Sequence, residues 1–218
     1  DELETVISDI ASHVKSASIK VIGIWSHFAR ADEPGSAMNQ TQLSRFNSAV
    51  EQLKNAGVSS EYLHLANSAA SLTNQDAHKN IIRWGIGLYG LSPDVNNMGS
   101  SAELGLKPAM KLISKLQLVK AVKAGQSVGY GSTATTKVDT KLGVVTMGYA
   151  DGIPRNANNL AGVFVAGQRA ALIGRVSMDQ FVVDLGAASL AKTGDEVIVF
   201  GDGSGGEYTI DEWAKACG

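Results

Sequence analysis

A single arginine stands inside an apolar, glycine-punctuated stretch of the sequence, residues 81–91. A guanidinium group is always charged and is rarely buried alone, so Arg83 must meet an acceptor such as a carboxylate, a phosphate or a ring nitrogen. Gly85 and Gly87 lack a Cβ atom, which would let a ligand approach their backbone N–H groups. The alternative is a buried strand whose arginine tip reaches solvent and whose glycines serve packing. Taken by itself, the stretch favours this alternative.

Polar groups also collect at the ends of other predicted strands in the first half of the chain. Barrel active sites are assembled in this way, because parallel strands that alternate with helices end at one common face. The groups are, in order, His27 and Asp32, then His64 and Ser68, then Arg83, Gly85 and Ile86. Each has a plainer interpretation, since a lone histidine at a strand end is usually a hydrogen-bonded structural residue.

The spacing of apolar residues predicts the elements that would carry these groups. The predicted elements are helices over 3–14 and 41–56, the second closed by Gly57 in a left-handed cap, and strands over 19–26, 62–66 and 81–91. Such alternation is typical of parallel strands with helices packed outside. The turn-rich stretch 92–102 then indicates a boundary. A partial (β/α) barrel is therefore predicted over 1–102.

Strands dominate the rest of the chain, so a compact β-domain is predicted over 103–218. The predicted strands are 112–122, 144–147, 163–165, 171–176, 181–185 and 197–200, with a hairpin at 166–168. A capping-box sequence runs from Thr209 to Glu212 and predicts a helix over Trp213 to Cys217. The fold class expected from these patterns is α/β plus β.

Composition argues against several classes of function. The chain has 218 residues, of which 44% are apolar, and a net charge of −2 without a basic face, so neither nucleic acid nor a membrane surface is an expected partner. No apolar run approaches the ~20 residues of a membrane span. The acidic start is unlike a signal peptide, which makes a cytoplasmic location the expectation. Cys217 is the single cysteine, so no internal disulfide and no metal site are predicted.

Three glycine-containing motifs in the second half carry further polar residues. They are Gly129-Tyr130-Gly131, then 148–155 with Tyr149 and Arg155, then 174–180 with Arg175, Met178 and Asp179. None is specific alone. A tyrosine beside glycine usually covers bare backbone, and Arg175 and Asp179 could form a surface ion pair of little energetic value.

Together, however, these motifs resemble those of alanine racemases. They occur in the family's order: His27-Phe28-Ala29-x-Ala31-Asp32-Glu33, His64-x-Ala66-Asn67-Ser68-Ala69, Arg83-x-Gly85-Ile86-x-Leu88-Tyr89-Gly90, Gly129-Tyr130-Gly131, Gly148-Tyr149-Ala150-Asp151-Gly152 and Gly174-Arg175-Val176-x-Met178-Asp179-Gln180. The resemblance runs from about Ile22 to the end. It implies the C-terminal part of a (β/α)8 TIM barrel followed by a mainly β C-terminal domain.

The resemblance also implies an activity. Alanine racemases bind pyridoxal 5'-phosphate and interconvert L-alanine and D-alanine by a two-base mechanism that uses a tyrosine and a lysine. They act as head-to-tail homodimers and supply D-alanine for peptidoglycan. An amino-acid racemase that uses this cofactor is therefore the expected class of enzyme, with alanine as its substrate.

By the same resemblance, Arg83 corresponds to the arginine that donates to the pyridine nitrogen of the cofactor. Ser68 and the N–H groups of Gly85 and Ile86 correspond to phosphate ligands. The residues expected to hold Arg83 and its surroundings are His64 and His27.

Tyr130 corresponds to the catalytic tyrosine, and the Met178 N–H to the group that holds the substrate carboxylate. The remaining residues assigned to substrate binding by the resemblance are Tyr149, Asp32, Arg155, Arg175 and Asp179. In the family, Tyr130, Tyr149 and Met178 serve the cofactor of the neighbouring subunit.

One family motif has no match. The cofactor lysine belongs to a Val-Lys-Ala-Asn-x-Tyr-Gly-type sequence, and the nearest stretches, at 119–121 and 122–124, share only Val-Lys-Ala and fall in predicted β-domain strands. We therefore interpret the chain as a fragment, inactive alone, whose lysine and final phosphate-binding segment lie outside it. An exposed sheet edge is expected. The alternative is a non-catalytic module that binds another chain or a phosphorylated ligand at Ser68 and Gly85.

Overall fold

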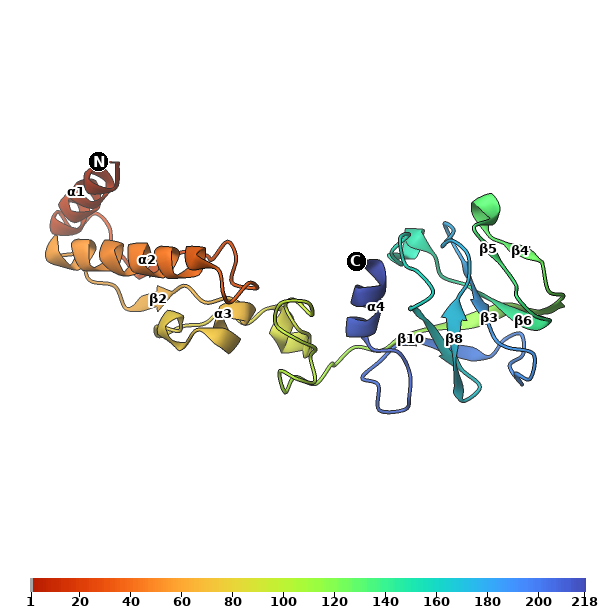
Figure 1. The fold of residues 1–218 in the computed structure, drawn as a ribbon. Coiled ribbons are helices and arrows are strands. Elements are labelled where there is room, and N and C mark those ends of the chain that lie inside the picture. The colour runs from red at the N-terminus through yellow and green to blue at the C-terminus, as the bar shows by residue number, and fades with distance from the viewer. Residues whose placement is uncertain (1) are drawn as a thin grey trace. The chain divides into compact units, whose positions relative to one another are not determined.

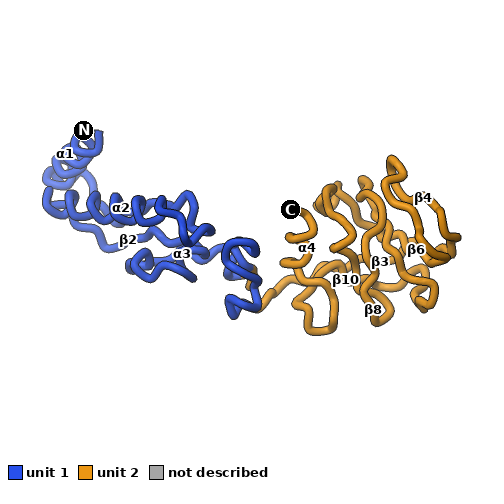
Figure 2. The backbone as a smooth tube through the Cα atoms, in the orientation of Figure 1, with its two compact units in different colours: residues 1–88, 92–106 blue, residues 89–91, 107–218 orange. Residues whose placement is uncertain are grey.

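The computed structural model describes residues 2–218. The chain forms two compact units (Figure 2). Unit 1 comprises the residues up to Leu88 together with Ser92–Leu106, and unit 2 comprises Tyr89–Leu91 and Lys107–Gly218. No helix within residues 2–218 has the length and apolar character needed to cross a bilayer.

Unit 1 is an α/β arrangement in which helices flank a small parallel sheet (Figure 1). Its elements are α1 (Glu2–Lys15), β1 (Gly23–Trp25), α2 (Ala37–Asn55), β2 (Tyr62–His64), α3 (Ser68–Thr73) and the 3₁₀ turn η1 (Gln75–Ala77), followed by the 3₁₀ turn η2 (Ile86–Tyr89) at the unit boundary. β1 and β2 are parallel, with Trp25 opposite His64. The predicted parallel pairing is confirmed, although each strand is shorter than predicted.

The two helices of unit 1 that apolar spacing predicts are both present. α1 packs against the end of α2 through Ile7 and Leu53. α2 begins at Ala37, four residues before the predicted start at 41, and Gly57 follows it with φ +82°, as expected of a left-handed cap. A second cluster, which includes Phe28, Leu43 and Leu65, packs the α2 face toward the strands.

The predicted third strand over 81–91 is wrong. Only Ile81 pairs, in an isolated parallel bridge to His64, and the chain then turns into η2. The backbone N–H groups of Gly85 and Gly87 donate to the Ser68 hydroxyl instead of to a neighbouring strand. β1 therefore pairs only with β2 among the described residues, which leaves one edge of β1 without a strand partner, as expected for an incomplete barrel.

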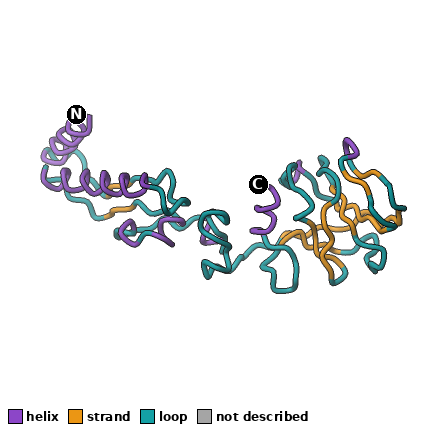
Figure 3. Tube along the Cα trace, in the orientation of Figure 1, coloured by secondary structure: helices purple, strands orange, loops and turns teal. Residues whose placement is uncertain are grey.

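Unit 2 is built around a closed barrel whose strands follow the order β10-β3-β6-β9-β8-β7. Their bounds are β3 (Leu112–Val122), β6 (Thr140–Val145), β7 (Gly162–Val165), β8 (Gln168–Leu172), β9 (Phe181–Asp184) and β10 (Glu196–Phe200). Figure 3 shows the strands gathered in this unit. Ala166 and Gly167 both have positive φ between β7 and β8, which confirms the predicted hairpin.

Several short elements of unit 2 are not predicted by the spacing of apolar residues. β4 (Ser127–Val128) and β5 (Ala134–Thr135) form a two-stranded hairpin around the 3₁₀ turn η3 (Tyr130–Ser132). A further 3₁₀ turn, η4 (Tyr149–Asp151), follows β6. Strands of two residues are too short to show an alternating pattern, so the sequence does not predict them.

Helix α4 (Ile210–Cys217) packs on the barrel and starts at the predicted capping box. The Thr209 hydroxyl accepts from the Glu212 N–H at 3.2 Å, and the Glu212 carboxylate accepts from the Thr209 N–H at 2.7 Å. The Trp213 indole N–H donates to the Val199 carbonyl at 2.8 Å. The helix therefore begins at Ile210, three residues before the predicted start at Trp213, because the residues that follow Thr209 in the capping box form its first turn.

Replacing Thr209 with alanine removes the oxygen that satisfies the first turn of α4. The expected loss is about 1 kcal/mol in the free energy of unfolding of unit 2, measured by urea denaturation. Lys215→Ala, on the exposed side of the same helix, is the control and should change that free energy by less than about 0.5 kcal/mol. Equal effects of the two substitutions would contradict the role of the cap.

Candidate active site

Arg83 is fixed by acceptors from the ends of β1 and β2. One terminal nitrogen, Nη1, donates to His64 Nδ1 at 2.8 Å. The other, Nη2, donates to His27 Nδ1 at 3.0 Å and to the carbonyls of Ser26 at 2.8 Å and Leu65 at 3.3 Å. Because a guanidinium can only donate, both Nδ1 atoms must carry a lone pair, and we infer that both imidazoles hold their proton on Nε2.

Two of the donors on Arg83 remain available. A guanidinium has five N–H groups, and the recorded acceptors engage Nη2 and one hydrogen of Nη1. Within residues 2–218, the Nε–H and the second Nη1 hydrogen have no recorded acceptor. The side chain is half-buried, so these donors face a partly solvated space. The sequence predicts that Arg83 needs an acceptor. In the structure Arg83 has several acceptors inside the protein, and it also keeps two N–H donors for a ligand.

A cavity of about 420 Å³ opens beside Arg83 in unit 1. This volume lies within the range of small-molecule sites. The cavity is lined by His27, Phe28, Ala29, Ala31, Asp32, Asn67, Ser68, Ala69, Arg83, Gly85, Ile86 and Pro93. Of the site residues predicted in the first half, His64 alone does not line the cavity, and it contacts Arg83 directly.

Ser68 organises one wall of this cavity. Its side chain is 4% exposed, and its oxygen accepts from the Gly85 N–H at 2.8 Å and the Gly87 N–H at 3.2 Å. The hydroxyl hydrogen is left to donate elsewhere. The Gly85 N–H, expected to meet a ligand, thus has a partner in the protein, whereas the Ile86 N–H begins η2 and has no acceptor within that turn.

A second cavity, of about 570 Å³, lies in unit 2 and is lined by Gly129, Tyr130, Ser177, Met178, Asp179 and Gln180. The Tyr130 side chain is 71% exposed and stands between two glycines that both have φ +73°. Among the described residues, no hydrogen bond of its hydroxyl is recorded. The phenol is therefore open to a ligand or to another chain.

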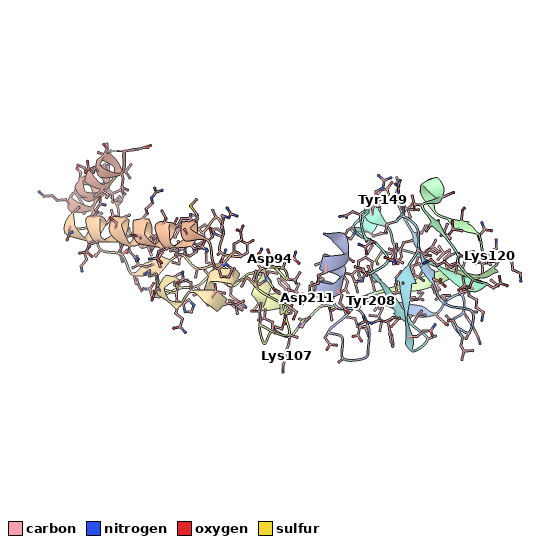
Figure 4. The ribbon with its side chains drawn as sticks, in the orientation of Figure 1. Asp94, Lys107, Lys120, Tyr149, Tyr208 and Asp211 are labelled. Atoms are coloured by element: carbon pink, nitrogen blue, oxygen red, sulfur yellow. The ribbon has the colours of Figure 1, made fainter. Side chains whose placement is uncertain are left out.

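Backbone hydrogen bonds tie Tyr149 to the Met178 turn within unit 2. The Tyr149 N–H donates to the Ser177 carbonyl at 3.0 Å, and the Ala150 N–H donates to the Met178 carbonyl at 2.9 Å. The Met178 N–H itself has no recorded acceptor among the described residues. Tyr149 stands on η4 (Figure 4), and the Arg155 guanidinium carbon lies 5.7 Å from the centroid of its ring. Three predicted substrate residues are thus brought together.

Arg175 lies beside the tyrosine turn of unit 2. A Cβ atom placed on Gly129 would lie 3.1 Å from the Arg175 backbone nitrogen, and one placed on Gly131 would lie 3.8 Å from its Nη1. The guanidinium thus sits next to the glycine that follows Tyr130. Within residues 2–218 no ion pair between Arg175 and Asp179 is recorded, so the interpretation of these two residues as a surface pair finds no support.

Sequence reasoning missed one residue of the unit 1 cluster. Trp25 stacks on the His64 ring, with centroids 6.0 Å apart and planes within 1° of parallel, and its ring centroid lies 5.6 Å from the Arg83 guanidinium carbon. The only local signal was that Trp25 stands two residues before His27, but β1 ends at Trp25, and it is the register opposite His64 that brings the indole to the cluster.

Comparisons with known proteins cover both units. A profile described as the alanine racemase C-terminal domain matches residues 109–218, and one described as the N-terminal domain matches residues 1–93. The curated alanine racemase of Frankia casuarinae is 48% identical over 200 residues, which is 92% of this chain and 52% of that protein. That of Streptomyces coelicolor is 46% identical over 200 residues, 92% of this chain and 51% of its own length.

Comparison with solved structures gives the same family. The alanine racemase of Streptomyces lavendulae, from a D-cycloserine producer, superposes with a TM-score of 0.92 at 43% identity, covering 99% of this chain and 56% of that one. The enzyme of Pseudomonas aeruginosa gives a TM-score of 0.79 at 41% identity, covering 95% and 55%. The chain spans about half the length of the relatives it matches. Because one profile alone matches half of its residues, the chain belongs to the alanine racemase family.

Proposed function

We propose that this chain supplies part of the active site of an alanine racemase, which interconverts L-alanine and D-alanine with pyridoxal 5'-phosphate. The observation that carries the proposal is Arg83: two imidazoles and two carbonyls hold its guanidinium, which keeps two N–H donors for a ligand beside the cavity that Ser68 lines. The strand-end groups belong in this view to the C-terminal part of a (β/α)8 barrel.

The residues of unit 1 fit the two polar ends of the cofactor. An acceptor nitrogen in a flat ring matches the free donors of Arg83, and a phosphate matches the Ser68 hydroxyl and the Ile86 N–H. When bound, the cofactor acts as an electron sink that makes the Cα proton of the amino acid acidic. Arg83 cannot give up its own proton, so an arginine at this position would leave the ring nitrogen unprotonated. The cofactor would then withdraw electrons less strongly, which suits proton exchange at Cα.

Unit 2 contributes the groups that act on the substrate. In the proposed reaction the deprotonated phenol oxygen of Tyr130 takes the Cα proton of L-alanine on one face and becomes a hydroxyl, and that hydroxyl gives a proton back on the same face when D-alanine is the substrate. The Met178 N–H holds the substrate carboxylate. Tyr149, Arg155, Arg175 and Asp179 of unit 2 take part in binding the substrate, and Asp32 of unit 1 does so as well. Tyr130, Tyr149 and Met178 serve the neighbouring subunit of a homodimer.

The second base of the proposed reaction is a lysine for which this chain offers no match. A two-base exchange needs a proton carrier on each face of the substrate, so these 218 residues alone are not expected to racemise alanine. A second candidate is a non-catalytic module that binds a phosphorylated ligand through Ser68 and Gly85, which both line the unit 1 cavity. The two candidates differ in one expectation: a segment that bears the lysine should restore racemisation only if the chain is part of a racemase.

Reconstitution separates them. The chain is mixed with pyridoxal phosphate and a separately produced segment that carries the lysine motif, and racemisation of L-alanine is followed by polarimetry. We expect activity to appear as the ratio of the two approaches unity. Absence of activity at every ratio, with retained binding of pyridoxal phosphate, would favour the binding module.

Tyr130→Phe tests the proposed base in the reconstituted enzyme. Loss of the hydroxyl should lower the rate of L-alanine racemisation by about 100-fold or more, while the affinity for pyridoxal phosphate stays unchanged. Tyr62→Phe is the matched control, since Tyr62 lies in β2 of unit 1 and does not line either cavity. Near-normal turnover of Tyr130→Phe would remove Tyr130 from its role.

Ser68→Ala tests the phosphate wall. The substitution removes the donor to a phosphate and leaves the amides of Gly85 and Gly87 without their acceptor, so the dissociation constant for pyridoxal phosphate should rise by about tenfold, measured by absorbance titration. Ser71→Ala is the control, because within residues 2–218 the Ser71 hydroxyl donates to the carbonyl of Asn67, the N-cap residue of α3, and not to the amides of Gly85 or Gly87. Equal affinities of the two variants would argue against a phosphate at Ser68.

A further inference from the structure

Trp25 is an exposed aromatic residue that packs on charged and polar side chains instead of on the core. Its side chain is 64% exposed, whereas its neighbour Ile24 packs against both apolar clusters of unit 1. Burial of apolar surface therefore does not explain the placement of the indole. What the indole contacts is the hydrogen-bonded pair formed by Arg83 and His64.

Strand register places the indole on the histidine. Trp25 and His64 are directly opposite each other in the parallel pair of β1 and β2, so their side chains share one face of the sheet. Their rings lie within 1° of parallel with centroids 6.0 Å apart, which is the offset stacking that aromatic pairs favour. The χ2 torsion of histidine is broad, so a parallel neighbour is an effective way to fix the imidazole plane.

The same indole faces the arginine. The Arg83 guanidinium carbon lies 5.6 Å from the Trp25 ring centroid, inside the distance at which a cation is attracted to an aromatic face. Trp25 thus touches both partners of the bond from Arg83 Nη1 to His64 Nδ1, which is 2.8 Å long. That bond determines which N–H groups of Arg83 remain for a ligand.

We infer that Trp25 is a positioning residue: it holds the His64 ring and the Arg83 guanidinium in the geometry that leaves the Nε–H and one Nη1 hydrogen of Arg83 available to an acceptor. The identity of that acceptor as the ring nitrogen of pyridoxal phosphate rests on the proposed function. The positioning itself rests on the contacts of Trp25 within this chain.

A measurement on the unsubstituted chain tests the contact directly. With isotope-labelled protein and without cofactor, the indole should give nuclear Overhauser effects to the ring protons of His64 and shift them upfield. The ring nitrogens of His64 should show a single Nε2–H form. Absence of the Overhauser effects in the folded chain would overturn the inference, and no substitution is needed to reach that result.

Substitutions then test the consequence. Trp25→Leu should convert His64 into a mixture of ring forms, broaden the Arg83 Nε–H signal and weaken binding of pyridoxal phosphate by about fivefold, whereas Trp25→Phe should retain most of the single form because it keeps an aromatic face. Tyr62→Leu, an exposed aromatic of the same sheet at the Gly23 position of the register, is the control. A purely structural role would not move the His64 ring nitrogens.

The two hypotheses fail separately. Unchanged His64 and Arg83 signals in Trp25→Leu would overturn the positioning role, whatever the cofactor does. Failure of the unsubstituted chain to bind pyridoxal phosphate would count against the proposed function and leave the nitrogen signals of His64 to decide the role of Trp25.

Discussion

Arg83→Ala is expected to abolish detectable binding of pyridoxal phosphate and to lower the stability of unit 1 by about 3 kcal/mol. The substitution removes donors to His64, His27 and the carbonyls of Ser26 and Leu65, so the ends of β1 and β2 lose their cross-link. Absorbance titration measures the binding. Urea denaturation of unit 1, followed through its amide signals, measures the stability.

Two further variants make the Arg83 result specific. Arg83→Lys keeps the charge but cannot reach both imidazoles with a planar fork, so it should recover part of the stability and little of the binding. Arg45→Ala removes an exposed arginine of α2 for which no hydrogen bond is recorded within residues 2–218, and it should leave both quantities unchanged. Native-like affinity in Arg83→Ala would show that the ring nitrogen has another partner.

Gly148→Ala is expected to lower the stability of unit 2 by about 3 kcal/mol. A Cβ atom on Gly148 would lie 2.3 Å from the Met178 carbonyl oxygen and 2.4 Å from that of Ser177. Both contacts are with backbone, so the turn that carries Tyr149 must move away from the Met178 turn and lose its hydrogen bonds. Urea denaturation and the amide signals of Tyr149 and Met178 measure the effect.

Gly152→Ala separates crowding from backbone strain in the same turn. Gly152 has φ +98°, and a Cβ atom added to it would meet no described atom within 4 Å, so alanine there should cost only about 1 kcal/mol through its left-handed conformation. If the two variants lost equal stability, the close approach of Gly148 to the Met178 turn would not be the cause.

Sequence patterns predict the residues that gather around Arg83, because strand ends and motif order are both visible in one dimension. They do not predict that 81–91 leaves the sheet. The reason is tertiary: the Ser68 hydroxyl takes the amides of Gly85 and Gly87, and the Trp84 ring lies where a side chain at Gly87 would stand. The sequence of an apolar run with glycines indicates neither the hydrogen bonds to Ser68 nor the contact with Trp84.

The parts of the candidate site in unit 2 show a different limit. The flanking glycines single out Tyr130, but the hairpin of β4 and β5 that presents it has strands of two residues each. Trp25 escapes sequence reasoning because a tryptophan in an apolar strand is usually core. Its contact with Arg83 depends on the register between β1 and β2, which no local pattern specifies.

The strand order of the unit 2 barrel constrains how this part of the chain can be made. β10 lies between β3 and β7, pairing Glu196 with Lys115 and Ile198 with Phe164. During synthesis from the N-terminus, β3 and β7 are complete before β10 is made. The strand edges of β3 and β7 that pair with β10 therefore stay unpaired until then. Closure of the barrel is therefore a late, long-range step, and folding of the segment that carries Tyr130 and Met178 depends on residues translated after both of them.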